Sequence, residues 1–465
     1  MRVVNTGCGR RRGMPLSTST VRTIRRSWQQ IILGVMVAGL VTGCRGLLTV
    51  TDPTLIQDSD LANAPGANAR RLRGVVALNQ SVGNVFGAVA MFTDERMFDT
   101  KFPQSLNVYA YLDMRDTARY IAQYGSGDDP MLSPLVGLLT NVAIALPAIR
   151  AYSPDSVRGE YLAQMYAFRG FAILQMAEDL CPGFPINEVR DGQSVYSMPY
   201  TTATALAYAG ATLDTALASG HDSTRFLDLA RVLRARVYLD QGQYELANSM
   251  AAAVPTDFVY QTDNGAGGSF GGLWTKQSFP NIPQAVGNRE GGVGLPFASA
   301  RDPRVVSVYK QMRYHRTADT VSDSLRDQQK YASAASPVVI ASGVEARLIE
   351  AEVALYANDP TTWLAKLNEL RDVAIAPSIP HLVDPGPATR LDTLFKERAF
   401  WLYLTGHRLG DMRRLVHQYG RAVNTVYPSG THPLGVPYGN AISIPFILNN
   451  ARQYNPHITT GCGAE

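Results

Sequence analysis

The histidines of this sequence are not spaced to hold a catalytic metal ion. The chain has seven of them, and no two stand in the H-E-x-x-H or H-x₃-H arrangement that brings two imidazoles to one face of a helix. The sequence also lacks a Walker A motif, the usual signal of a loop that holds nucleotide phosphates. We therefore expect neither a metal ion nor a cofactor.

Three carboxylates stand close together early in the chain. Asp94 and Glu95 are adjacent, and Asp99 follows shortly after them. Glycoside hydrolysis needs two carboxyl groups at a fixed separation, one of them acting as the acid. A chain with 39 acidic residues offers many such pairs by chance, so a structural or solvated acidic motif is the preferred interpretation. We predict that the protein is not an enzyme.

Aromatic residues in loop-like segments are better suited to binding than any of these groups are to catalysis. Tyr260, Phe270 and Trp274 lie in a stretch rich in glycine, serine and asparagine, and Tyr109 with Tyr111 follows the acidic motif. Aromatic rings stack on the C–H faces of sugars while neighbouring polar groups bond the hydroxyls. These five residues are candidate ligand contacts. The alternative is that the rings only pack the loops onto the rest of the fold.

The first 43 residues have the composition of a targeting segment. They contain seven arginines and no acidic residue, and an apolar run of about a dozen residues follows at 31–41, too short to span a bilayer as a helix of roughly 20 residues. The run ends at Leu40-Val41-Thr42-Gly43-Cys44, which resembles the lipobox of bacterial lipoproteins. We expect residues 1–43 to be a signal peptide and Cys44 to carry the lipid; an ordinary signal peptide with a chance cysteine is the alternative.

The charge and the cysteine count of the remaining chain indicate which partners it can have and whether it can form a disulfide. The whole chain has 43 basic and 39 acidic residues, so without the seven leader arginines it is slightly acidic and shows no sign of nucleic-acid binding. Cys181 and Cys462 are the cysteines left once Cys8 is removed with the leader and Cys44 is lipidated. In an exported protein they form either a disulfide or two separate thiols.

Long helices must position these side chains. Residues 160–180 repeat apolar residues at spacings of three and four, the stripe of a packed helix. Residues 201–219 form an alanine-rich helix with Thr201 or Thr202 as its N-cap.

Two helical hairpins follow. In residues 226–253, Ala235, Tyr238 and Ala247 have the spacing at which tetratricopeptide repeats place small residues where helices cross. Residues 344–371 form the second hairpin, in which Thr361 or Thr362 is a candidate cap. Such repeat scaffolds usually bind rather than catalyse. We predict a mostly α fold, a tetratricopeptide-like helical hairpin scaffold with a long loop-rich insertion.

The chain is divided accordingly. Composition changes to glycine, serine and proline between the two hairpins, and a long irregular stretch inside a compact domain is usually functional. The expected divisions are a signal peptide at 1–43 and one domain at 44–465, made of a helical scaffold (60–257 and 338–420), a loop-rich elaboration (258–337) and a C-terminal tail (421–465).

One stretch carries a specific family likeness. In residues 396–414 (KERAFWLYLTGHRLGDMRR), Glu397-Arg398, Gly406-His407-Arg408 and Asp411-Met412-Arg413-Arg414 stand in order. This pattern resembles the late helix of the SusD/RagB family of surface lipoproteins, although Leu409-Gly410 replaces its usual aromatic pair. Further segments agree in order along the chain: Phe92-Thr93-Asp94-Glu95, Ile444-Pro445 and Asn455-Pro456.

The resemblance implies a function and a location. Members of this family capture nutrients at the outer surface of the bacterial outer membrane and partner TonB-dependent transporters. We therefore expect a surface-exposed, lipid-anchored protein that captures oligosaccharides or peptides and delivers them to such a SusC-like transporter. A periplasm-facing tetratricopeptide scaffold lipoprotein that assists outer-membrane assembly is the alternative.

Overall fold

The structure is a computed structural model, and it describes residues 58–98, 115–124, 129–190, 193–220, 223–265, 272–274, 284–312, 320–431 and 437–463. The chain divides into two units, 1–60 and 61–465. Cys44 lies outside the described residues, so its lipidation stays a prediction. Everything below concerns the second unit.

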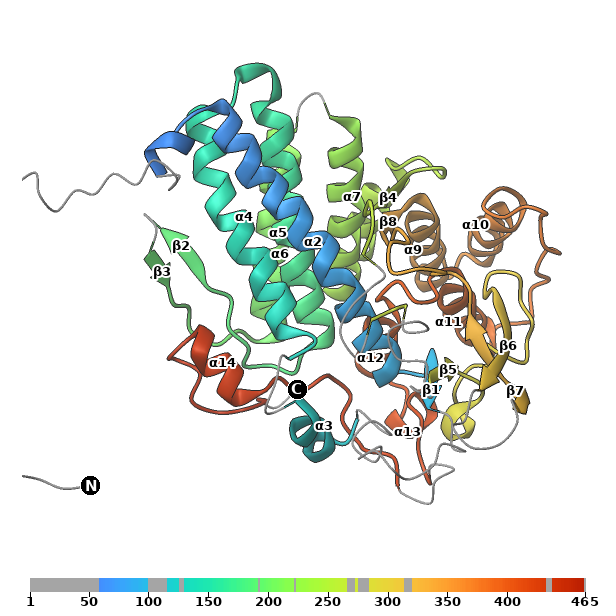
Figure 1. Cartoon of the computed structure of the whole chain (residues 1–465). Helices are drawn as coiled ribbons and strands as arrows, with labels where there is room; N and C mark the ends of the chain where they lie inside the picture. The colour runs from blue at the N-terminus through green and yellow to red at the C-terminus, as the bar shows by residue number, and fades with distance from the viewer. Residues whose placement is uncertain are drawn as a thin grey trace, which may run out of the picture. The chain divides into compact units, whose positions relative to one another are not determined.

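Helices build most of this unit (Figure 1). After a short 3-10 helix (η1, Asp58–Leu61), the long helices α2 and α4 pack against each other. From α4 to α10, each helix packs against the next along the chain, as in stacked helical hairpins. The predicted fold class is therefore confirmed. The helices of this scaffold are α2 (Ala64–Phe92), α4 (Leu132–Tyr152), α5 (Asp155–Asp179), α6 (Thr202–Ser219), α7 (Thr224–Asp240), α8 (Tyr244–Ala252), α9 (Gly343–Tyr356) and α10 (Pro360–Val373).

Shorter helices and four small antiparallel ladders complete the unit. The helices are α3 (Thr117–Tyr124), η3 (Glu290–Gly292), α11 (Arg390–Trp401), α12 (Arg408–His417), α13 (Val423–Val426) and α14 (Leu448–Tyr454). The ladders pair β1 (Arg96–Phe98) with β5 (Gln284–Val286), β2 (Glu188–Arg190) with β3 (Gln193–Val195), β4 (Val259–Gln261) with β8 (Val339–Ser342), and β6 (Ser307–Met312) with β7 (Thr320–Gln328).

Helix starts and crossings follow local sequence rules, with one exception. Thr201 caps α6 by accepting a hydrogen bond from the amide of Thr204, and Ala235 and Ala247 are fully buried where α7 meets α8. The suggested cap of α10 is wrong. Asp359 accepts from the amide of Thr362, because a carboxylate one residue before a proline at the first helical position is a strong N-cap.

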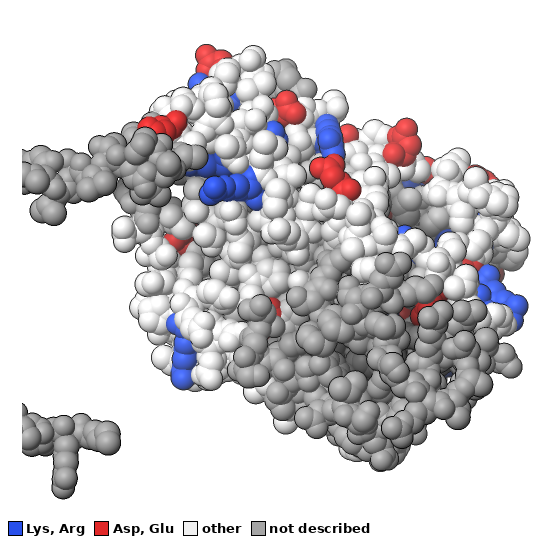
Figure 2. Space-filling view, in the orientation of Figure 1, with Lys and Arg blue, Asp and Glu red and all other residues white. Residues whose placement is uncertain are grey.

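Helices α2 and α4 are each long and apolar enough to cross a membrane by length and composition alone. Both are largely buried: 78% of the most apolar window of α2 and 56% of that of α4 lie inside the unit. Burial in the core explains their composition. Figure 2 shows a group of basic side chains over the upper part of the face formed by these helices and few charged side chains over the rest of it.

Candidate functional site

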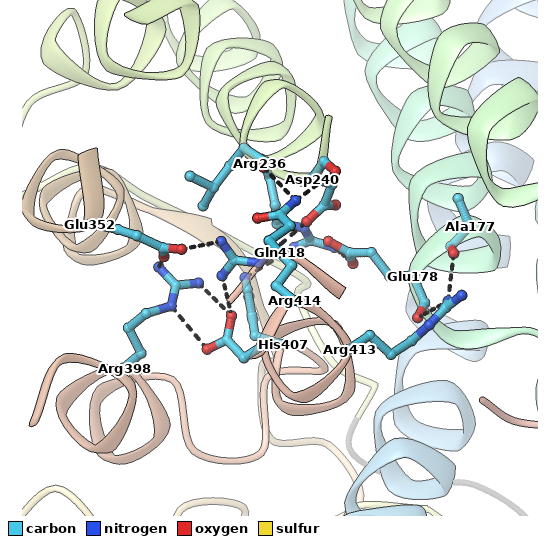
Figure 3. Close-up of polar contacts among 12 residues, drawn as sticks. Ala177, Glu178, Arg236, Asp240, Glu352, Arg398, His407, Arg413, Arg414 and Gln418 are labelled. Atoms are coloured by element: carbon cyan, nitrogen blue, oxygen red, sulfur yellow. Dashed lines mark hydrogen bonds and ion pairs between the residues drawn. The ribbon is translucent and has the colours of Figure 1, made fainter. Parts of the chain in front are cut away.

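The motif at 396–414 forms a buried network of ion pairs between helices (Figure 3). Asp411 on α12 accepts hydrogen bonds from Nε and Nη2 of Arg398 on α11 at 2.9 and 2.8 Å. It also accepts one from Nη2 of Arg414 at 2.6 Å. Arg414 reaches Glu352 on α9 at 2.6 Å as well. Three helices are thus joined through charged side chains that are nearly inaccessible to solvent.

Electrostatics fix the charge state of this network. Burial by itself raises the pKa of Asp411, but the guanidinium groups of Arg398 and Arg414 outweigh burial and hold it well below its ordinary value. A carboxylate that stays ionised and accepts three hydrogen bonds does not exchange protons near neutral pH. Asp411 therefore helps to hold the helices together and does not act as an acid or base near neutral pH.

The early acidic motif is bonded to the same stretch, 396–414. The helices that these buried side chains join are called the frame below. Asp94 accepts hydrogen bonds from Nε and Nη2 of Arg408 at 2.7 and 2.9 Å and from the amide of Leu295 at 2.7 Å. Glu95 Oε1 accepts from the amide of Leu404 at 2.7 Å. The sequence indicates none of these partners, because Arg408 and Leu404 lie more than three hundred residues away in the chain.

Asp94 and Glu95 superficially resemble a glycosidase pair. Burial raises the pKa of Glu95 to about 7, although the Leu404 amide and Arg408 partly oppose the effect. Both residues are at most 1% exposed, so no substrate reaches their oxygens, and general acid catalysis requires that reach. The third carboxylate, Asp99, lies outside the described residues.

Trp274 is held in place by the chain just before it. Arg96 on β1 donates to the carbonyls of Gly272 and Leu273 at 3.1 and 2.9 Å, and the amide of Leu273 donates to Gly83 of α2. Trp274 is half-buried and packs against the core, and its Nε1 is buried without a hydrogen-bond partner among the described residues. The residues just before it are therefore fixed, and Trp274 itself is partly exposed.

The described residues that border the two aromatic segments proposed from the sequence meet in one ladder. In the β1–β5 ladder, Phe98 stands opposite Gln284. Phe98 is the last described residue before 99–114, and Gln284 is the first after 275–283. Tyr109, Tyr111 and Phe270 themselves lie outside the described residues, so their role as ligand contacts stays a prediction.

Tyr260 is a correction to the candidate list. It is 4% exposed, and its ring packs 6.1 Å from Phe168 and 6.0 Å from Phe226, measured between centroids. The ring belongs to the core because β4 pairs with β8, which packs against α7, and the ring itself contacts aromatic residues of α5 and α7. It therefore has no face to offer a ligand.

Comparison with known proteins places this architecture. No family model matches the sequence, and no curated protein matches it. NanU of B. fragilis has a similar structure, with a TM-score of 0.60 at 12% identity over 89% of this chain and 100% of that one. The surface glycan-binding protein A of Bacteroides uniformis gives 0.57 at 11% identity over 86% and 99%. A SusD-like carbohydrate binding protein of Bacteroides vulgatus gives 0.53 at 17% identity over 87% and 94%.

The chain has the SusD-like fold. At these identities the likeness concerns the fold and not the ligand. It agrees with the resemblance seen in residues 396–414, whose charged side chains in this SusD-like structure are the ones that join the helices.

A hydroxyl–imidazole–carboxylate row lies in the same SusD-like frame and was not anticipated from the sequence. Thr405 Oγ1 lies 2.9 Å from Nδ1 of His407, and His407 Nε2 lies 3.1 Å from Glu345 Oε2. Such rows activate hydroxyl nucleophiles in hydrolases. Here all three residues are at most 5% exposed, so the row stabilises the turn between α11 and α12.

The sequence also contains a second motif that is typical of hydrolases and that was not considered above. Residues 267–271 match the G-x-S-x-G pattern, which in α/β-hydrolases sits on a strand-to-helix turn of a large sheet. The two-stranded sheets among the described residues of this SusD-like structure are all antiparallel, and serine 269 lies outside the described residues. The required context is therefore lacking in the part of the chain that the structure describes.

The C-terminal tail is tied to the body by a disulfide. Cys181, just after α5, is bonded to Cys462, and their Cα atoms are 5.3 Å apart. The amide of Gly463 donates to the carbonyl of Pro182 beside it. Metal ligation is not indicated either, since no group of three His, Cys, Asp or Glu residues in the described part of the chain is placed to hold an ion.

Proposed function

We propose that this protein is a surface-exposed, lipid-anchored binding protein that captures oligosaccharides or peptides and delivers them to a partner TonB-dependent outer-membrane transporter. The observation that carries the proposal is that residues bordering both aromatic segments meet at the β1–β5 ladder, where Arg96 also bonds the two residues before Trp274. Asp94, Glu95, Arg398 and Asp411 of the motifs at 92–95 and 396–414, in contrast, are buried and bonded within the frame.

The chemistry of capture follows from a fixed ring on a rigid frame. A tryptophan whose backbone is held loses little freedom on binding, and one well-placed aromatic ring contributes on the order of 1–2 kcal/mol at a binding site. Two of the similar structures are named as glycan- or carbohydrate-binding proteins, which supports a sugar ligand.

The test is a glycan and peptide array on residues 45–465, followed by titration calorimetry with the best ligand. Trp274→Ala should weaken the affinity about tenfold, whereas the melting temperature should fall only modestly because the residue is half-buried. Tyr356→Ala is the matched control, because Tyr356 is an exposed aromatic residue on α9. Lower stability with intact affinity would make Trp274 a packing residue and move the search to Tyr109 and Tyr111.

The anchor and the partner rest on Cys44 and on the family resemblance. Replacing Cys44 with Ser should release the protein from the membrane or leave its leader uncleaved. A processed Cys44→Ser protein that stays in the membrane contradicts the anchor. Co-purification of the tagged protein with a TonB-dependent transporter tests the partner.

The stacked hairpins α7–α8 and α9–α10 keep the periplasmic scaffold as a second candidate, since such surfaces often bind other proteins. Protease added to intact cells separates the two functions. A surface receptor is digested, whereas a periplasm-facing scaffold is protected until the outer membrane is opened.

A further inference from the structure

A cleft of about 370 Å³ lies on the helical scaffold, between α4, α5, α6 and β2. Its volume falls within the range of small-ligand sites. One wall is apolar and comes from α4, with Leu146 and Pro147 among its residues. Tyr166 on α5 and Tyr208 on α6 also line the cleft. Neither this cleft nor its residues belong to the aromatic segments that carry the proposed function.

The two tyrosines of the cleft are held in fixed positions. The ring of Tyr208 stacks on that of Tyr200, with centroids 5.8 Å apart and planes inclined by 12°. Its hydroxyl donates to Glu188 on β2 at 2.6 Å and accepts from Arg169. Rigid, half-buried rings with satisfied hydroxyls form an amphipathic wall that suits a molecule with both C–H faces and hydroxyl groups.

The charges of the cleft favour an anion. Arg150, in the last turn of α4, is exposed, donates to the hydroxyl of Tyr166 and forms no ion pair with a described residue. Arg169 lies 3.5 Å from Glu188. The lining residues thus include two arginines and one carboxylate. Arg150 is the one suited to pair with a ligand carboxylate through its planar guanidinium group.

A backbone acceptor adds to the polar groups of the cleft. Pro147 lies inside α4 and has no N–H, so the carbonyl of Ala143 four residues earlier lacks its helical donor. Ala143 also lines the cleft. A ligand hydroxyl would supply the donor that this carbonyl lacks.

We propose that this cleft binds an acidic sugar unit, a hydroxylated ring that carries a carboxylate, with Arg150 pairing the carboxylate and Leu146 and Pro147 lying against the ring. The inference extends the proposed function, since it names acidic glycans as a substrate class, but the cleft is separate from Trp274. A free monosaccharide therefore tests the cleft without testing capture by the loops.

The experiment is titration of the full chain, purified in detergent at pH 7 and low salt, with D-glucuronate by saturation-transfer NMR. D-glucose and acetate serve as matched probes that lack the charge and the ring. Glucuronate should bind at least tenfold more tightly than either. Equal binding of glucose removes the role of charge, equal binding of acetate reduces the cleft to a simple anion site, and no binding of glucuronate overturns the proposal.

Variants assign the binding to this cleft. Arg150→Gln should weaken glucuronate binding at least tenfold without changing the melting temperature, because the side chain is exposed. Ala211→Trp, at an exposed cleft position of α6, should abolish binding by filling the space. Arg231→Gln on α7 is the control and should have no effect. Unchanged binding in Arg150→Gln contradicts the proposal, whereas loss in Trp274→Ala alone would assign glucuronate to the loops.

Discussion

Asp411 holds the ends of two arginines, and replacing it with asparagine perturbs the frame at its centre. The amide of the Asp411→Asn variant would keep one oxygen acceptor but lose the charge that three hydrogen bonds from Arg398 and Arg414 now share, at 2.9, 2.8 and 2.6 Å. Two buried guanidinium groups would then rely mainly on Glu352, which Arg414 reaches at 2.6 Å and Arg398 at 3.6 Å.

The size of the effect follows from burial. Three charge-assisted hydrogen bonds contribute about 1.5–3 kcal/mol each, but their sum overestimates the stability lost in Asp411→Asn. An amide side chain is cheaper to bury than a carboxylate, and Glu352 keeps both arginines partly paired. Breaking a buried ion pair by removing one partner typically costs about 3–5 kcal/mol. We expect Asp411→Asn to lower the free energy of unfolding by that amount, a large part of the roughly 5–15 kcal/mol of a typical domain.

Urea unfolding of residues 45–465, followed by circular dichroism, measures this loss. Asp392→Asn is the matched control: Asp392 pairs with Arg421 at 2.6 Å, but its side chain is 61% exposed, so a loss of at most about 1 kcal/mol is expected. A loss for Asp411→Asn no larger than that of the control would refute the account of the network. Replacing Asp411 and Arg398 together by leucine and methionine should cost less than Asp411→Asn alone.

Three further predictions concern single positions. The folded pKa of Glu95, about 7, lies above its ordinary 4.5, so its contribution to stability is fully present below pH 4.5 and is lost as the pH rises through 7. Glu95→Gln should therefore gain stability relative to the native chain by roughly 3 kcal/mol between pH 4 and 8. Urea midpoints of the two proteins that change in parallel across that range would contradict this. Reducing the Cys181–Cys462 bond, which closes a loop of 281 residues, should lower the free energy of unfolding by up to about 5 kcal/mol in the chain-entropy model, as compared by urea unfolding with and without reductant; an unchanged midpoint contradicts it. Gly406→Ala should cost about 2–3 kcal/mol in the same assay, since φ is +78° and a Cβ would lie 2.3 Å from the ring of Phe86; a loss below about 1 kcal/mol would show that the turn adapts.

Local pattern was enough to predict the scaffold. The apolar stripe of α5 and the small residues at the α7–α8 crossing depend on spacing within one or two helices, which a single sequence carries. The start of α10 was misassigned because Thr361, Thr362 and Asp359 are all good caps, and only the chain geometry at Pro360 selects the carboxylate.

Contacts between residues far apart in the chain could not be predicted from the sequence. Asp94 and Arg408 are adjacent only because α12 packs on α2, so an acidic pair in the sequence gave no sign that its charges were already neutralised. Tyr260 looked like a loop aromatic because glycines follow it, yet the pairing of β4 with β8 turns its ring into the core. The Arg150 cleft was likewise invisible, since its residues come from four separate elements.

Titration calorimetry with the best ligand from the array, combined with mass spectrometry of the recovered ligand, tests the central claim most directly. A binding protein should saturate with one oligosaccharide or peptide, lose about tenfold in affinity in Trp274→Ala and not in Tyr356→Ala, and return the ligand chemically unchanged. Conversion of the ligand, or no saturable binding to any glycan or peptide by a folded protein, would contradict the account.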